Sequence, residues 1–195
     1  DAFAIQSDIA QKIVAAVGAR LTSGEQQGLA TAPTSNPEAY QLYLQGLEYR
    51  RRVGYMRQDY EIAQRFFERS VAIDPGFALA HVALAGVHGG MYWNSYDPTP
   101  ERAARQREEA EIALRLAPDL PQAHYAMGFA HYYGRLDYRR ALDEFAIAVK
   151  RLPNDAALTS AIGSVQRRMG NWDDAVASYR KALQIDPRSA GRSYE

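Results

Sequence analysis

Four segments of the chain end in closely similar sequences, and this repetition constrains the fold more than any other feature. Each segment is rich in alanine, valine, leucine and isoleucine and closes on a proline, namely Pro75, Pro118, Pro153 or Pro187. The prolines lie 43, 35 and 34 residues apart. Because proline cannot continue a helix, each is expected to follow a helix end. This spacing indicates a repeated pair of helices.

A second repeated block begins the helix before three of these prolines. Each block contains Asp or Asn, then an aromatic residue, then an alanine that stands twelve positions before its proline. Asp and Asn are predicted to cap the helix, and the alanine is predicted to let a neighbouring helix approach closely. The blocks are Asp59-Tyr60-x-x-Ala63, Asp137-Tyr138-x-x-Ala141 and Asn171-Trp172-x-x-Ala175.

An amphipathic stretch with helical spacing precedes each of these helices and predicts the first member of each pair. Gly46, Gly128 and Gly163 stand at the same position in three of these stretches. A glycine inside a helix costs about 1 kcal/mol, but its missing Cβ lets two helices cross closely. The repeated unit is therefore predicted to be a tight helical hairpin.

A helix pair of about 34 residues, with small residues at its crossing and a proline at its end, resembles the tetratricopeptide repeat. The resemblance covers about Asn36 to Ser189 and implies an all-α solenoid of four units, residues 37–75, 76–118, 119–153 and 154–189. The first two units carry extra residues between their helices. Gln106 stands where the family has alanine, and the usual large aromatic of the first helix is replaced by Leu42, His81, His124 and Thr159.

The remaining parts of the chain are expected to differ from the repeats. Residues 1–22 form a predicted amphipathic helix, because Ile5, Ile9, Ile13, Val17 and Leu21 recur every fourth residue. Residues 23–36 are predicted to be a linker, with an Asn-Pro pair that begins the next helix. Residues 190–195 are interpreted as a truncated tail, and the start lacks both a Met and a secretion signal. The chain is therefore expected to be a piece of a longer protein.

The first 46 residues resemble the repeat regions that follow TolB-like domains in bacterial regulatory proteins. The resemblance covers the opening helix, the linker and the sequence from Asn36 to Gly46. In such proteins an amino-terminal nucleotide cyclase, winged-helix DNA-binding domain or protein kinase precedes the repeats. The resemblance implies that this chain is the regulatory, protein-binding part of a bacterial signalling protein.

Composition narrows the function further. The chain has 23 basic and 23 acidic residues, so no net charge draws it to nucleic acid or anionic lipid, and an RNA-reading helical repeat is disfavoured. It has no cysteine, which fits a reducing compartment such as the cytoplasm. It contains no apolar run of the roughly 18 residues that a membrane span needs. No phosphate-binding loop, nucleophile elbow or zinc-protease motif is present, so neither enzymatic activity nor a cofactor is expected.

Four histidines form the one constellation with a possible metal-binding arrangement. His81 and His88 are seven residues apart, as are His124 and His131, so each pair shares one face of its helix. A metal site shared by the two helices is one interpretation. The favoured interpretation is that they are core residues, because they occupy repeat positions that are normally aromatic and buried.

The family resemblance implies that the first helix of each unit lines a concave groove that binds a peptide or protein. Aromatic rings in the middle of this groove and arginines at its ends favour an extended peptide with acidic character. A chaperone-tail site is disfavoured, because Tyr43 and Leu47 stand where such sites use Lys and Asn. The predicted groove residues are Tyr40, Tyr43, Leu47, Arg50, Arg51, Gln122, Tyr125, Phe129, Tyr132, Tyr133, Arg167 and Arg168, while Gly86, Gly89 and Gly90 would leave the second unit shallow.

Two further interactions remain open from the sequence. The aromatic insertion from Met91 to Tyr96 either presents its rings to a partner or folds back onto a neighbouring helix, and the second outcome is favoured. The apolar opening helix and the abrupt end leave a homo-oligomer as an alternative function.

Overall fold

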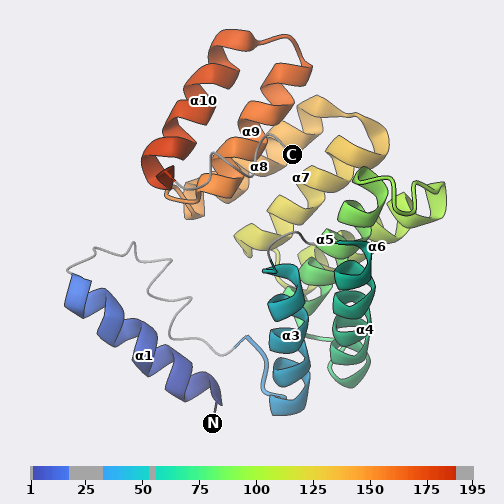
Figure 1. The fold of residues 1–195 in the computed structure, drawn as a ribbon, viewed down its shortest axis with the longest axis vertical. Helices are drawn as coiled ribbons and strands as arrows, with labels where there is room; N and C mark the ends of the chain where they lie inside the picture. Colours follow the sequence, from blue (N-terminus) through green and yellow to red (C-terminus); the bar gives the residue numbers. More distant parts are fainter. Residues whose placement is uncertain (1, 18–32, 53–55, 188–195) are drawn as a thin grey trace. The chain divides into compact units, whose positions relative to one another are not determined.

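The computed structural model describes residues 2–17, 33–52 and 56–187, and every regular element in these ranges is an α-helix (Figure 1). The chain divides into two compact units, residues 1–80 and 81–195. The helices are α1 (Ala2–Val17), α3 (Pro37–Arg50), α4 (Arg57–Ile73), α5 (Ala78–Trp93), α6 (Pro100–Leu116), α7 (Pro121–Arg135), α8 (Tyr138–Arg151), α9 (Ala156–Arg168) and α10 (Trp172–Ile185).

The four repeated prolines end helices as predicted. Helices α4, α6, α8 and α10 end at residues 73, 116, 151 and 185, so each proline follows its helix by two residues. This constant offset means that the same local sequence terminates the second helix of every pair.

The predicted caps are confirmed in part. The Asn36 side chain accepts from the backbone N–H groups of Glu38 and Ala39, both at 3.1 Å. Asp137 caps α8 by accepting from the Arg140 N–H at 3.1 Å. The prediction for Asp59 was wrong, because α4 begins two residues earlier and Asp59 instead accepts from the Met56 N–H at 3.1 Å. Asn171 stands at the start of α10, but its side chain makes no capping hydrogen bond.

In the first unit, α3 and α4 pack as an antiparallel pair around small residues (Figure 1). A Cβ added at Gly46 would lie 2.7 Å from Phe67 Cζ, so the ring fills the space that the glycine leaves. The buried Ser70 hydroxyl donates to the Ala39 carbonyl at 2.8 Å and ties α4 to α3. The predicted close crossing at Gly46 is therefore confirmed.

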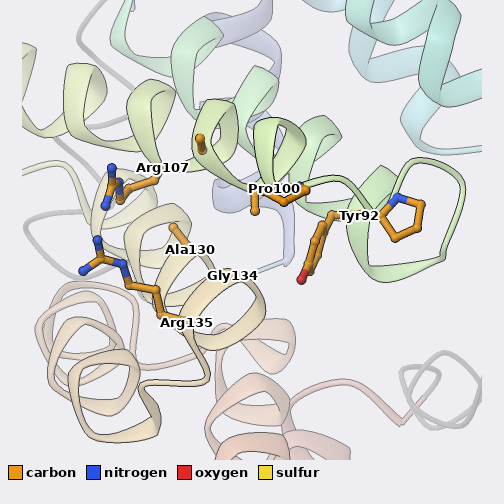
Figure 2. Close-up of a pocket in the computed structure, with 9 residues that line it drawn as sticks. Tyr92, Pro100, Arg107, Ala130, Gly134 and Arg135 are labelled. Carbon is orange, nitrogen blue, oxygen red and sulfur yellow. The ribbon is translucent and has the colours of Figure 1, made fainter.

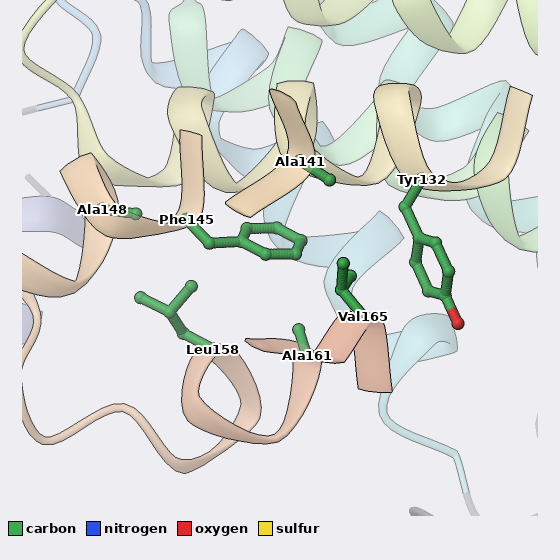
Figure 3. Packing of buried hydrophobic residues seen from close by; sticks show 7 residues of the cluster. All are labelled: Tyr132, Ala141, Phe145, Ala148, Leu158, Ala161 and Val165. Carbon is green, nitrogen blue, oxygen red and sulfur yellow. The ribbon is translucent and has the colours of Figure 1, made fainter. Parts of the chain in front are cut away.

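In the second unit, the ring of Phe145 lies at the centre of a core formed by α7, α8 and α9 (Figure 3). The side chains of Leu158, Ala161 and Val165 reach toward this ring from α9. Phe145 itself is fully buried, and Gly128 of α7 lies against it. Burial of this apolar surface, at about 25 cal/mol per Å², holds the α7–α8 pair to the first helix of the next pair.

The second pair departs from the regular repeat. A Cβ added at Gly89 would lie 2.7 Å from Gln106 Cδ, so Gly89 is buried against α6. Gln106, which replaces the family's alanine, is itself 1% exposed. The expectation that Gly89 lines an open groove was therefore wrong. Helix α5 also continues to Trp93, so the first half of the Met91–Tyr96 insertion is helical.

Helix α1 is present as predicted over residues 2–17, with Ile9 50% and Ile13 57% exposed. The predicted end of this helix at residue 22, the side chains of Ile5, Val17 and Leu21, most of the 23–36 linker and the 190–195 tail lie outside the described residues. Within the described ranges, none of the helices combines the length and apolar character needed to cross a bilayer.

Candidate protein-binding surface

Four aromatic rings of the second unit form a continuous row along α7 to the end of α5. Tyr125, Phe129 and Tyr133 recur every fourth residue on α7, and consecutive centroids are 4.9 Å apart in both steps. Trp93 continues the row by stacking on Tyr133, with centroids 4.5 Å apart and planes inclined by 20°. We call these four residues the aromatic row. Such offset contacts between rings hold the side chains in a defined arrangement.

Trp93 gives the aromatic row an accessible end. Its side chain belongs to the last turn of α5 and remains 41% exposed although it packs on Tyr133. Met91, two residues earlier in the same segment, is 2% exposed. The insertion therefore does both things that the sequence left open: Met91 packs into the core, and Trp93 folds onto α7 while keeping a face in solvent.

The Arg168 side chain at the end of α9 borders the aromatic row. The Arg168 guanidinium lies 5.7 Å from the Trp93 ring centroid, a distance at which a cation is attracted to the face of an aromatic ring. A hydrogen bond to Tyr132 raises the pKa of Arg168 further above its already high value. Arg167 is exposed beside it on α9. This end of the surface therefore carries the positive charge of Arg168 next to an indole and a phenol ring.

Tyr132 is a correction to the predicted groove. The structure buries it to 3% exposure among Ala141, Phe145 and Val165, and Figure 3 shows its ring on the α9 side of α7. Both Tyr132 and Tyr133 contact Trp93, but Tyr132 is part of the buried core whereas Tyr133 is only partly buried. Tyr132 therefore supports the surface from beneath and offers little area to a partner.

The first unit carries its own group of predicted residues on α3. Tyr40 and Tyr43 stack at 6.3 Å, and Tyr43 makes an edge contact with Phe77 at 5.0 Å. Burial raises the pKa of Tyr43, and the nearby charges of Arg50 and Arg51 partly oppose that rise. Both exposed arginines therefore lie close enough to Tyr43 for their charges to affect its pKa.

The remaining predicted residues are partly accessible. Leu47 is half-buried on α3. Gln122 is half-buried at the start of α7, and within the described part of the chain its Oε1 atom has no hydrogen-bond partner. The structure thus groups the predicted site residues into two sets, one in each compact unit: Tyr40, Tyr43, Leu47, Arg50 and Arg51 in the first, and Gln122, Tyr125, Phe129, Tyr132, Tyr133, Arg167 and Arg168 in the second.

Trp93 is the residue that sequence reasoning left out of the groove. The prediction followed regular repeat positions, and Trp93 lies in the extra residues of the second pair. The signal that could have found it was the run of aromatic residues in an insertion next to a first helix rich in tyrosine.

Three of the four histidines act as structural links between helices. His81 Nδ1 lies 2.6 Å from Glu109 Oε2, and His124 Nδ1 lies 2.7 Å from Glu144 Oε2. The remaining two histidines differ, because Arg102 donates to His88 Nδ1 at 2.8 Å whereas His131 Nδ1 is buried without a partner among the described residues.

These contacts favour the core interpretation of the histidines over a shared metal site. His81 and His88 are 6% and 3% exposed, and His124 also lies 2.9 Å from the Pro118 carbonyl oxygen. Across residues 2–17, 33–52 and 56–187, no three His, Asp or Glu side chains form a group that could hold a metal ion.

Stacked helical hairpins with small residues at their crossings define a helical-repeat scaffold. Residues 156–189 match the family model of the tetratricopeptide repeat. The matched segment is therefore a tetratricopeptide repeat, and the structural relatives below share the all-helical fold of this chain.

Solved structures with the same fold include several proteins of low sequence identity. The tetratricopeptide domain of Sgt2 from Aspergillus fumigatus has a TM-score of 0.54 at 18% identity, covering 73% of this chain and 85% of that one. The first such domain of Spaghetti (RPAP3), bound to the HSP90 peptide SRMEEVD, has a TM-score of 0.53 at 14% identity, covering 72% and 99%. MamA from Desulfovibrio magneticus RS-1 has a TM-score of 0.53 at 16% identity, covering 95% and 96%.

A curated relative is similar in sequence over most of this chain. It is a protein of Rhizobium meliloti (strain 1021) named putative adenylate cyclase 3, and it is 29% identical over 145 residues. The match covers 74% of this chain and 24% of the relative's length. The chain thus corresponds to about a quarter of that protein.

Proposed function

We propose that this chain is a protein-binding scaffold whose aromatic row, together with Arg167 and Arg168 at the end of α9, recognises an extended peptide segment with acidic residues. The observation that carries the proposal is the stack of half-exposed Trp93 on Tyr133 beside the Arg168 guanidinium. The family fold is of the scaffold type, and we propose that this chain has no catalytic activity and no cofactor of its own.

The chemistry of the surface supports an acidic, partly apolar peptide. Stacked rings lose little conformational entropy when a partner covers them, so Tyr and Trp are favourable contact residues. Arginine binds carboxylates through two parallel hydrogen bonds and tolerates partial desolvation better than lysine. Peptide side chains of Leu or Phe type would cover the aromatic row, and Asp or Glu would pair with the arginines.

The relative's name supports a role in bacterial signalling. We propose that the repeats form the regulatory part of a larger cytoplasmic protein, in which an effector such as a nucleotide cyclase precedes them. The support is the partial match to putative adenylate cyclase 3. The two compact units would then provide separate peptide-binding surfaces, the aromatic row in the second unit and the Tyr40–Tyr43 surface with Arg50 and Arg51 in the first.

Trp93 provides a direct test of the second-unit surface. The chain has two tryptophans, so Trp172→Phe leaves Trp93 as the only indole. In this background, a peptide library containing Asp, Glu, Leu and Phe is screened for saturable changes in Trp93 fluorescence. The best peptide is expected to bind at least about tenfold more weakly to the Tyr133→Ala, Arg168→Gln double variant, because the stack and a charge are lost together.

Matched controls separate site binding from general charge attraction. Arg180 is exposed on α10, away from the aromatic row in sequence and helix, so Arg180→Gln is expected to leave the affinity unchanged. The HSP90 peptide SRMEEVD has acidic residues but neither Leu nor Phe, so it serves as a specificity control and is expected to bind more weakly than the best library peptide. Equal affinity of the double variant and Arg180→Gln, with both folded by circular dichroism, would reject the proposed surface.

Self-association is a second candidate function that a specific observation favours. Helix α10 exposes large apolar side chains: Trp172 is 64%, Val176 46% and Leu183 40% exposed. These positions recur at helical spacing and form one face, which a second copy could cover. Light scattering across a concentration series tests this alternative, and a constant monomer mass up to about 1 mM would exclude it, since weak dimers dissociate near that value.

A further inference from the structure

A concave site separate from the aromatic row lies in the second unit, where the end of α5, the start of α6 and the end of α7 meet (Figure 2). Its volume is about 310 Å³, which is at the lower end of the range for small-molecule pockets. Six of its nine described lining residues are small or apolar, namely two prolines, three alanines and Gly134. The polar groups are Tyr92, Arg107 and Arg135. The aromatic row of the proposed function does not contribute to this lining.

The two arginines give the pocket a charged end. Figure 2 shows the Arg107 and Arg135 side chains extending to the same side of the pocket from α6 and α7, while Tyr92 lies at the opposite end. The nine described lining residues include no acid. Bringing two guanidiniums together without an anion between them is electrostatically unfavourable, so this end of the pocket attracts a negatively charged group.

Neighbouring acids leave much of this charge unneutralised. Arg107 Nε lies 3.5 Å from Glu111 Oε1, but both side chains are 40% or more exposed, so that ion pair is weak. Asp97, next to the lining residue Pro98, is held by Arg102 at 2.6 Å. Arg135 ends α7 and has no ion pair with any described residue.

The space between α6 and α7 is kept open by a small residue. A Cβ at Gly134 would already touch the Ala103 Cβ at 3.4 Å, and a longer side chain would project into the pocket. Gly134 therefore allows an apolar body to lie against the alanines and prolines while its charged end reaches the arginines.

We propose that this pocket binds an apolar group that carries a carboxylate, with the carboxylate between Arg107 and Arg135 and the apolar part against the alanine and proline lining. Guanidinium groups bind carboxylates through paired N–H donors, and the volume accommodates about one ring with a short chain. The carboxylate belongs either to a small free acid or to the carboxyl terminus of a peptide.

Backbone amide NMR of the intact chain tests the proposal with 3-phenylpropionate as the free acid. A tripeptide that ends in phenylalanine provides the peptide arm. The neutral controls are 3-phenylpropanamide and the amidated tripeptide. Saturable shifts at Ala103, Ala130 and Gly134 are expected with a Kd on the order of 1 mM for so small a ligand. The arm that binds more tightly identifies the source of the carboxylate.

Two variants act on different parts of the site. Arg135→Gln is expected to weaken binding at least tenfold by removing one charge, and Gly134→Leu is expected to abolish it by filling the pocket. Arg180→Gln is the charge control, and Arg168→Gln separates this site from the aromatic row; neither should change the affinity. Equal shifts from the acid and its amide, no shifts in either arm, or full binding by a folded Arg135→Gln variant would overturn the proposal.

Discussion

The ring of Phe145 occupies the space that a side chain at Gly128 would need. A Cβ built at Gly128 would lie 2.5 Å from Phe145 Cδ1, closer than non-bonded carbon atoms approach in folded proteins. Phe145 is fully buried, so the ring has no solvent into which to move. The same relationship joins Gly46 to Phe67 in the first unit. The glycine and the ring thus determine how closely the two helices of a pair approach.

Gly128→Ala is therefore expected to destabilise the second unit by about 1–3 kcal/mol, because overpacking outweighs the roughly 1 kcal/mol gained in helix propensity. Urea unfolding followed by circular dichroism measures the change. Gly134→Ala, in the same helix, is the matched control: its Cβ would meet Ala103 Cβ at an ordinary 3.4 Å, so the effect should be neutral or slightly stabilising. Equal losses in both variants would contradict this account of the crossing.

Two asparagines at helix starts are expected to respond differently to mutation. Asn36→Ala should cost about 1 kcal/mol, because it removes an acceptor that serves two N–H groups of α3. Asn171→Ala should change stability by only a few tenths of a kcal/mol, since its side chain makes no capping bond. Amide hydrogen exchange in the first turns of α3 and α10 checks the difference locally. A larger increase of exchange in α10 on Asn171→Ala than in α3 on Asn36→Ala would refute the prediction.

His88 is expected to make the second unit sensitive to acid. Burial, with the charges of Arg102 and Arg105, lowers its pKa from 6.5 to about 4, which Asp97 only partly offsets. Between these values the unfolded chain binds a proton that the folded chain does not. Stability is therefore fully present above about pH 6.5 and falls toward pH 4, by about 2 kcal/mol at pH 5.

His88→Asn supplies the control for that prediction, because an amide oxygen can accept from Arg102 without titrating. The stability of the wild type relative to this variant should decrease by about 2 kcal/mol from pH 8 to pH 5, as measured by urea unfolding. Other titrating groups affect both proteins and cancel in the comparison. A difference that is independent of pH would show that His88 titrates normally.

The Trp93–Tyr133 stack predicts a spectroscopic signature. In the Trp172→Phe background, Tyr133→Ala is expected to expose more of the Trp93 indole and move its fluorescence emission to longer wavelength. Tyr125→Ala, which removes a ring at the far end of the aromatic row, should leave the emission unchanged. An emission maximum that does not respond to Tyr133→Ala would mean that the two rings are not stacked in solution.

Local sequence rules predicted the helices because the relevant interactions lie close together in the chain. The prolines, the caps at Asn36 and Asp137, and the glycine crossings all depend on residues within one helix pair. Asp59 was misassigned because the extra residues of the first unit allow α4 to begin earlier, where Met56 supplies the cap position.

The surface was harder to predict because it depends on contacts between pairs. Tyr132 and Tyr133 are adjacent in sequence, yet the first is buried by α8 and α9 and the second stacks on Trp93. The Arg107–Arg135 pocket was not predicted for the same reason, since its residues come from three helices and from no repeat position that the pattern marks.

The two-residue offset between helix end and proline is constant, whereas the length between the two helices of a pair varies. Extra length is accommodated between the helices of one pair, as in the continuation of α5 to Trp93, while the joints from Pro75 to Pro187 stay the same. Each proline-containing connection starts the next helix pair in the same way, so residues inserted within one pair do not change the sequence pattern of the following pair. New binding residues can therefore be added by insertion between the two helices of a pair, while the connections between pairs stay unchanged.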